Sequence, residues 1–74
     1  MDFRQLVRDS RHSASEIANK FGLAQSTVYH WMRGQHMPTP CAIHAIAALL
    51  GVNVDRVRAA LEVSRNRFRG VRSS

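Results

Sequence analysis

The stretch "SASEIANKFGLAQSTVYHWMRG", residues 13–34, decides the fold. It begins with S-x-x-E, in which the side chains of Ser13 and Glu16 can each accept a hydrogen bond from the other's backbone amide at the start of a helix. Apolar residues then recur at helical spacing as far as Gly22, and a second helical pattern runs to Gly34. Glycine suits the left-handed position that ends a helix. The stretch therefore predicts two consecutive helices joined by a short turn.

The spacing of small residues predicts how these two helices meet. Ala18 allows a close approach, and Gly22 permits the positive φ of a tight turn. Val28 fills the space beneath the crossing, and Leu23 is expected to close the turn as an apolar plug. The pattern is that of two helices crossing at a sharp angle.

The rest of the chain is also helical in its periodicity, and it contains no strand-like alternation. Asp2 can cap a first short helix, Thr39 can cap a fourth after the loop "QHMPTP", and Asn53 can cap a fifth. The residues expected to face inward are Phe3, Leu6 and Val7 in the first helix, Ala14, Ile17, Ala18 and Phe21 in the second, Val28, Trp31 and Met32 in the third, Ile43, Ile46, Ala47 and Leu50 in the fourth, and Val54, Val57 and Leu61 in the fifth. We expect an all-α, compact five-helix domain.

Length and composition limit the class of protein. Seventy-four residues suffice for one small domain. The single cysteine, Cys41, cannot form an intrachain disulfide, and we expect it to be buried as a small hydrophobe. The N-terminus is too charged for a signal peptide, and the longest apolar run, Ala45–Leu50, is too short to span a bilayer. We expect a soluble cytoplasmic protein with no membrane partner.

Positive charge is concentrated at the C-terminus. The formal net charge is +6, of which the four arginines of residues 65–74 contribute +4. We therefore divide the chain into a body, residues 1–64, and an Arg-rich tail, residues 65–74. The tail has two interpretations: a disordered solubilising end, or an arm that follows DNA phosphates or enters the minor groove. Part of it could also extend the fifth helix or pack against a partner subunit. The arginines of such an arm are Arg65, Arg67, Arg69 and Arg72.

The helix expected over residues 25–33 has two unlike faces. Val28, Trp31 and Met32 lie in one arc of a helical wheel and are expected to be core. The opposite arc holds Ser26, Tyr29, His30 and Arg33, with Gln25 at the helix start. An idle solvated face would favour Glu and Lys, and this one has neither. The mixture of donors, acceptors and a ring indicates a binding surface.

The capping box, the spacing of Ala18, Gly22 and Val28, and "W-M-R-G-x-x-x-P" ending at Pro38 together resemble a known family. They are similar to the helix-turn-helix domains of the phage lambda-repressor and Cro type, also called the XRE family, over residues 13–61. The resemblance implies that the second and third helices form the helix-turn-helix and that the third lies in the DNA major groove.

The resemblance also implies the contacts with DNA. Base contacts fall on Gln25, Ser26, Tyr29 and His30, whose side chains can pair with base edges. Backbone contacts fall on Ser13, Ser15, Gln35, His36 and Thr39, to which we add Arg33 because it ends the helix. The loop after the third helix lacks the Lys or Arg that family members often carry, so the Arg-rich tail is expected to supply charge there.

The function implied is that of a sequence-specific, double-stranded DNA-binding transcriptional regulator, most like a small phage Cro-type repressor. It would occupy a palindromic operator as a homodimer in the bacterial cytosol or nucleoid, pairing through its fifth helix and tail. Activation is disfavoured because the second helix offers polymerase only Glu16. The alternatives are an architectural, excision-type DNA-bending factor, and a protein-interaction module that acts as an antitoxin or binds a host factor.

Other chemistry is not indicated. The residues His30, His36, Cys41 and His44 lack the paired spacing of structural zinc sites. No Ser-His-acid set is suggested. We expect no metal, no cofactor, no small-molecule ligand and no enzymatic activity.

Overall fold

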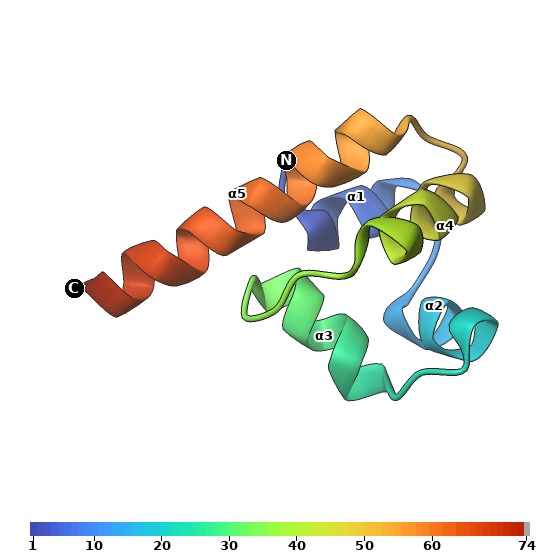
Figure 1. Ribbon diagram of the computed structural model, residues 1–74, viewed down its shortest axis with the longest axis horizontal. Helices are drawn as coiled ribbons and strands as arrows, with labels where there is room; N and C mark the ends of the chain where they lie inside the picture. Colours follow the sequence, from blue (N-terminus) through green and yellow to red (C-terminus); the bar gives the residue numbers. More distant parts are fainter. Residues whose placement is uncertain (74) are drawn as a thin grey trace.

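The computed structural model describes the backbone of residues 1–73 and the side chains of residues 1–69. The described backbone contains five α-helices joined by short loops, and it contains no strand. The helices are α1 (Phe3–Asp9), α2 (Ala14–Phe21), α3 (Gln25–Arg33), α4 (Pro40–Leu50) and α5 (Val54–Ser73). The expected all-α fold is confirmed. α5 is the longest helix, and it packs against α1, α3 and α4 (Figure 1). α2 packs mainly against α3, and in Figure 1 both lie below α5, with α2 farther from it than the end of α3.

The helix ends follow the capping residues read from the sequence. Asp2 accepts a hydrogen bond from the Gln5 amide at 2.8 Å, and Thr39 accepts one from the Ala42 amide at 3.2 Å. Ser13 accepts from the Glu16 amide at 3.3 Å, but the Glu16 carboxylate does not complete the predicted capping box. It pairs instead with Nδ1 of His12 at 2.9 Å. Only half of the reciprocal box is therefore formed in the described structure.

The core holds nearly all of the apolar residues expected to face inward. Phe21 and Val54 are exceptions, since they are only partly buried at its edge. Two expectations are wrong. Leu23 is 38 % exposed and therefore does not plug the turn between α2 and α3. Cys41 is exposed rather than buried, because it lies on the outer side of the first turn of α4.

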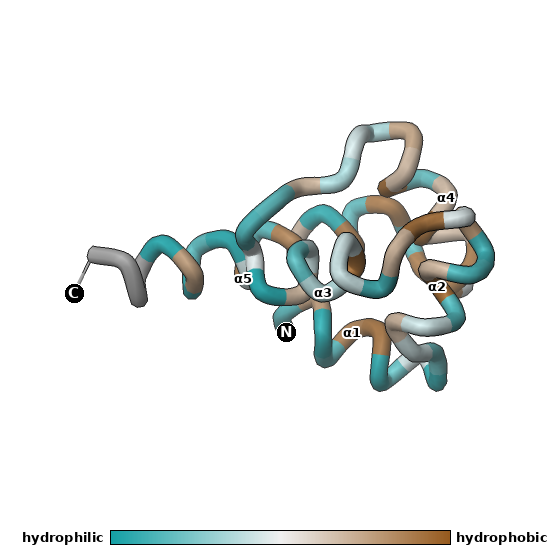
Figure 2. The backbone as a smooth tube through the Cα atoms, turned by 90° about the horizontal axis from the view of Figure 1, so that it is seen from below, coloured by the Kyte–Doolittle hydropathy of each residue, from teal (hydrophilic) through white to brown (hydrophobic). Residues whose placement is uncertain are grey.

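The helix α5 runs past residue 64, as in the interpretation in which part of the Arg-rich tail extends the fifth helix. It continues as α-helix to Ser73 and extends beyond the other helices, so the Arg-rich segment begins as helix (Figure 1). Within the described residues this extension is mostly hydrophilic (Figure 2).

Two other helices attach to α5 at Ser64. The Ser64 hydroxyl, on a residue only 2 % exposed, accepts a hydrogen bond from the Phe3 amide at 3.0 Å and so holds the start of α1. Gly34, which ends α3 with φ +84°, lies against the same backbone: a Cβ added there would be 2.2 Å from the Ser64 carbonyl oxygen. Asp2 also accepts a hydrogen bond from Arg67 at 2.5 Å. We call the contact of Phe3, Gly34 and Ser64 the α5 junction.

No single helix among the described residues is both long and apolar enough to cross a membrane. α4 and the part of α5 up to Arg69 reach that length and composition only as a pair, which is bent by 113°.

Replacing Gly34 with Ala tests the α5 junction. The alanine would adopt a strained positive φ, costing roughly 1–2 kcal/mol, and its Cβ would overlap the α5 backbone, adding about 1–3 kcal/mol. Gly22→Ala is the matched control, because Gly22 also has a positive φ of 66° but no atom within 4 Å of an added Cβ. Urea unfolding should show a clearly larger loss of stability for Gly34→Ala. Equal losses in the two variants would mean that the close approach does not matter.

Replacing Ser64 with Ala removes the acceptor of the buried Phe3 amide. A buried donor left without a partner costs about 1–3 kcal/mol. Ser10→Ala serves as a control, because Ser10 donates a hydrogen bond only to the carbonyl of Leu6 within its own helical turn, and it is partly exposed. Thermal unfolding should show a lower midpoint for Ser64→Ala than for Ser10→Ala, and the opposite order would contradict the role given to Ser64.

Candidate nucleic-acid interface

The helix α3 is held to the body by one face and leaves the other open. Val28 is fully buried and Trp31 is 6 % exposed, so these two residues fix the helix in the core. On the opposite side Tyr29 is 43 % exposed and His30 is half-buried. The other outward residues, all exposed, are Gln25, Ser26 and Arg33. The predicted division of the helix into a core face and an outward face is therefore present in the structure.

The starts of α2 and α3 are connected by side chains. Nε2 of Gln25 donates a hydrogen bond to Oγ of Ser15, and Ser13 caps α2 close by in sequence. Gln25 is therefore oriented by the neighbouring helix, with its carbonyl oxygen and a second amide hydrogen available. This contact brings together one residue predicted for base contact and one predicted for backbone contact.

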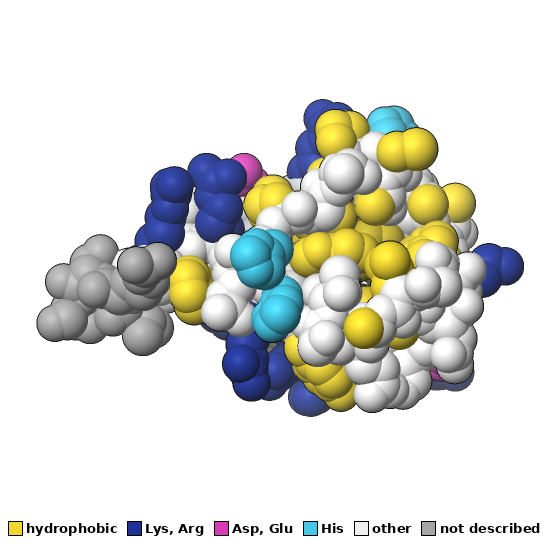
Figure 3. Space-filling view, turned by 60° about the horizontal axis from the view of Figure 1, so that its bottom comes forward, with side chains coloured by type: hydrophobic (Ala, Val, Ile, Leu, Met, Phe, Trp, Pro, Cys, Tyr) yellow, Lys and Arg dark blue, Asp and Glu magenta, His cyan; other side chains and the backbone are white. Residues whose placement is uncertain are grey.

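The loop after α3 lies beside the outward face of that helix. The backbone amide of Gln35 donates to the carbonyl of His30 at 3.0 Å, and the rings of His30 and His36 meet edge to face with centroids 5.2 Å apart. Figure 3 shows histidine side chains in contact near the middle of this face, with Lys or Arg side chains gathered on either side. Thr39 is exposed, but its hydroxyl oxygen is occupied in capping α4.

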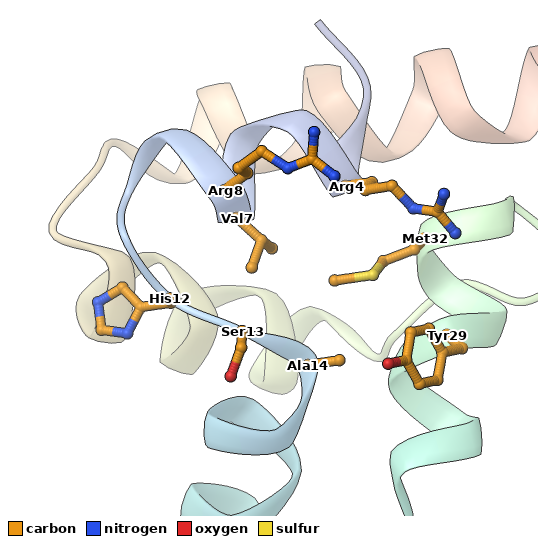
Figure 4. A pocket seen from close by; sticks show the side chains of 8 residues that line it. All are labelled: Arg4, Val7, Arg8, His12, Ser13, Ala14, Tyr29 and Met32. Atoms are coloured by element: carbon orange, nitrogen blue, oxygen red, sulfur yellow. The ribbon is translucent and has the colours of Figure 1, made fainter.

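A groove of about 420 Å³ lies between α1 on one side and the start of α2 and the middle of α3 on the other (Figure 4). Arg4 and Arg8 lie along its α1 side, while Ser13 and Tyr29 line the opposite side, with the Tyr29 hydroxyl pointing toward the start of α2. The unpaired amides of a helix start attract anions, and two guanidinium groups beside them strengthen that preference. The groove is suited to an anionic group such as a phosphate.

Arginines occupy two further hollows at the other end of α3. One, of about 210 Å³, lies between the loop after α3 and α5, and it is lined by Gly34, Gln35, Met37, Arg65, Phe68 and Arg69. The other, of about 300 Å³, is lined by Asp2, Arg4, Met32, Arg33 and Phe68. Of the arginines grouped together as an arm, Arg65 and Arg69 line the first hollow, and none of those with described side chains lines the second. Arg67 is turned to Asp2, and the side chain of Arg72 lies outside the described residues.

Comparison with known families identifies this arrangement. Residues 2–68 match the profile of the helix-turn-helix domain. The chain belongs to the helix-turn-helix domain family. It is thus a DNA-binding domain, whose helix-turn-helix is the pair α2 and α3. No curated protein and no solved structure matches the chain.

Sequence reasoning missed part of this helix-turn-helix domain's positive surface. Arg4 and Arg8 are not among the predicted DNA contacts, although their spacing of four residues places them on one face of a helix. That spacing was the available signal. The spacing does not reveal that α1 packs beside α3. This packing brings Arg4 and Arg8 to the edge of the outward face of α3.

Metal ligands do not gather in the described part of the helix-turn-helix domain, where no three side chains of His, Cys, Asp or Glu are close enough to hold one ion. His30 and His36 meet, but Cys41 and His44 are on α4.

The groove can be tested with Arg8→Gln. If it holds a DNA phosphate, loss of one cation should reduce the slope of log affinity against log salt by about 0.9. The matched control is Arg56→Gln, an exposed residue in the first turn of α5, the end that Figure 1 places away from α3. The measurement is the anisotropy of a labelled duplex at several KCl concentrations. The groove assignment is wrong if the two variants change the slope equally.

Proposed function

We propose that this helix-turn-helix domain is a sequence-specific regulator of transcription that binds double-stranded DNA with α3 in the major groove. The observation that carries the proposal is the outward face of α3, where Gln25, Ser26, Tyr29 and His30 are accessible while the inner face is locked in the core. A helix fixed in this way presents its side chains to base edges at low entropic cost.

The chemistry of these four side chains is suited to contacts with base edges, and therefore to recognition of a DNA sequence. The Gln25 amide can pair with N6 and N7 of adenine, and the Ser26 hydroxyl can serve several bases. His30 can donate to N7 or O6 of guanine, and the Tyr29 ring can pack on a thymine methyl group or send its hydroxyl to a phosphate. These four side chains are proposed as the base contacts.

The residues around α3 support contacts with the DNA backbone on both sides of the major groove. Ser13 and Ser15 stand at the start of α2, and Gln35, His36 and Thr39 stand in the loop, with Arg33 between them at the end of α3. Phosphate contacts of this kind set the position of a recognition helix, whereas base contacts set its specificity. The tail arginines Arg65, Arg67, Arg69 and Arg72 are the remaining candidates.

The mode of action that fits best is repression by operator occupancy in a bacterial cytosol, as in small phage repressors of the Cro type. A domain of this size reads only a few base pairs, so we propose that it binds a palindromic operator as a homodimer, with half-sites about one helical turn apart. The proposed dimer contact is formed by α5 and the tail, on the side of α5 that is turned away from the loop after α3.

Selection of bound sequences from a random duplex library tests the proposal. A palindromic consensus with half-sites about one helical turn apart is expected. A strongly bent duplex bound in arrays would favour an architectural factor instead. Failure to enrich any sequence, together with a stoichiometric complex with another protein, would favour an interaction module.

Changing Gln25 and His30 to Ala, singly and together, tests the base contacts. Each lost contact should cost roughly 1–3 kcal/mol of binding free energy and relax the preference at one base pair. Asn19→Ala, an exposed and uncharged position on α2, is the control. Titration of the selected duplex gives the affinities. Unchanged affinity in both Gln25→Ala and His30→Ala would remove α3 from the proposal.

A further inference from the structure

We propose that α5 and the loop after α3 jointly form a binding site for a DNA backbone phosphate, in which Arg65 and Arg69 provide the charge that the loop lacks. We call it the α5 clamp. It rests on the proposed function, since its ligand is the DNA strand that α3 would lie against. It differs from a basic arm, because only part of the Arg-rich segment takes part.

The hollow between the loop and α5 supplies the space. Its volume is about 210 Å³, and Gln35 and Met37 form one side while Arg65 and Arg69 form the other. The two arginines are four residues apart and so share a face of the helix. The loop, residues 35–39, contains no Lys or Arg of its own. Two elements distant in sequence thus combine into one positively charged hollow.

The hollow is held in place by the α5 junction. Gly34 lies directly against the backbone of Ser64 and Arg65: a Cβ added there would be 2.7 Å from the Cα of Arg65. Pro38, at the other end of the loop, is buried. The spacing between the loop and the arginine face of α5 is therefore set by packing, so binding requires little ordering of the backbone.

The side chain of Arg65 shows an unmet hydrogen-bonding need. It is half-buried, and its Nε is withdrawn from water with no hydrogen-bond partner among the described residues. Buried donors are nearly always paired in folded proteins. Because Arg65 also lines the hollow, an acceptor bound there is the partner that we propose for its guanidinium group. A phosphate oxygen entering the hollow would bring that acceptor and pair with the guanidinium charge.

The position of the hollow indicates which anion it binds. Gln35 lines the hollow, and its backbone amide donates a hydrogen bond to the backbone carbonyl of His30. The ring of His36 contacts the ring of His30. The hollow thus adjoins the C-terminal end of α3, whereas the groove of Arg4 and Arg8 lies beside the middle of that helix, on the α1 side. A recognition helix in the major groove has a phosphate strand on each side. The α5 clamp would hold one strand, and the groove beside α1 would hold the other.

Arg67 provides the contrast. It lies on the opposite side of α5 from Arg65, and its guanidinium is bonded to Asp2 at 2.5 Å. A flexible arm would use Arg65, Arg67 and Arg69 alike, whereas the α5 clamp uses Arg65 and Arg69 only.

The test compares Arg69→Gln with Arg67→Gln, two exposed positions on one helix with the same change of charge. The probe is the duplex recovered by selection, or a short random-sequence duplex if no consensus emerges. Its affinity is measured across KCl concentrations. For Arg69→Gln the slope of log affinity against log salt should fall by about 0.9, and for Arg65→Gln with Arg69→Gln by nearly twice that. For Arg67→Gln the slope should stay at the wild-type value. Thermal unfolding of each variant shows that the fold is intact.

Interference by phosphate ethylation gives a second measurement. Arg69→Gln should lose sensitivity at one phosphate per half-site, while Arg67→Gln should keep the wild-type pattern. Equal reductions of the salt slope in the two variants would establish an arm and overturn the clamp. Wild-type slopes in both would overturn it as well. Loss of DNA binding by Gln25→Ala with His30→Ala, alongside wild-type slopes for Arg69→Gln, would leave the proposed function standing while the clamp fails. Absence of DNA binding by the unmodified chain overturns both.

Discussion

The backbone of α5 at Ser64 is the point on which the arrangement of this domain depends. One residue accepts the first amide of α1 through its hydroxyl and receives the end of α3 against its carbonyl. Both contacts bring residues distant in sequence close together, and both require small groups. At Ser64 the group is a hydroxyl small enough to be enclosed, and at Gly34 it is a residue without a Cβ. Because α1 and α3 are positioned by the same turn of α5, the groove between α1 and α3 and the hollow beside α5 keep a fixed relation to each other.

The distribution of charge follows from this arrangement. The helix-turn-helix itself, α2 and α3, carries few cationic side chains. Glu16, in the first turn of α2, is paired with His12. The arginines around α3 come from α1 and α5, which are far from it in sequence. The positive charge around the outward face of α3 thus comes from the two ends of the chain, and the central stretch contributes the side chains proposed for base contact.

Most of the fold was predictable because it depends on local rules. Helical spacing, capping residues and glycines at helix ends act within a few residues of each other, so the positions of the five helices could be inferred. The end of α1 was harder, since Arg11 adopts a positive φ of 61° there without a glycine to signal it. Glu16 took an alternative partner, His12, that the capping pattern does not reveal.

What the sequence did not predict depends on tertiary packing. The exposure of Leu23 is decided by how the turn after α2 meets its neighbours, and periodicity carries no information about that. The exposure of Cys41, in contrast, follows from its place on α4 opposite Ile43 and Leu50, and a helical wheel would have indicated it. The separation of Arg67 from Arg65 requires knowing that the tail continues as a helix and that Asp2 lies beside it. The outward face of α3 was predictable, because it follows from a wheel, whereas the arginines that flank it were not.

The contact between Gly34 and Ser64 also has a consequence for how such a domain can diversify. A larger side chain at either position would disturb the packing of α5 against α1 or α3, so neither residue can change freely while the fold is kept. The outward residues of α3, in contrast, touch little of the core, and they can be exchanged with small effects on folding. On the proposed function, a lineage carrying this scaffold could acquire new DNA-sequence preferences in single steps, without first gaining compensating mutations in its interior.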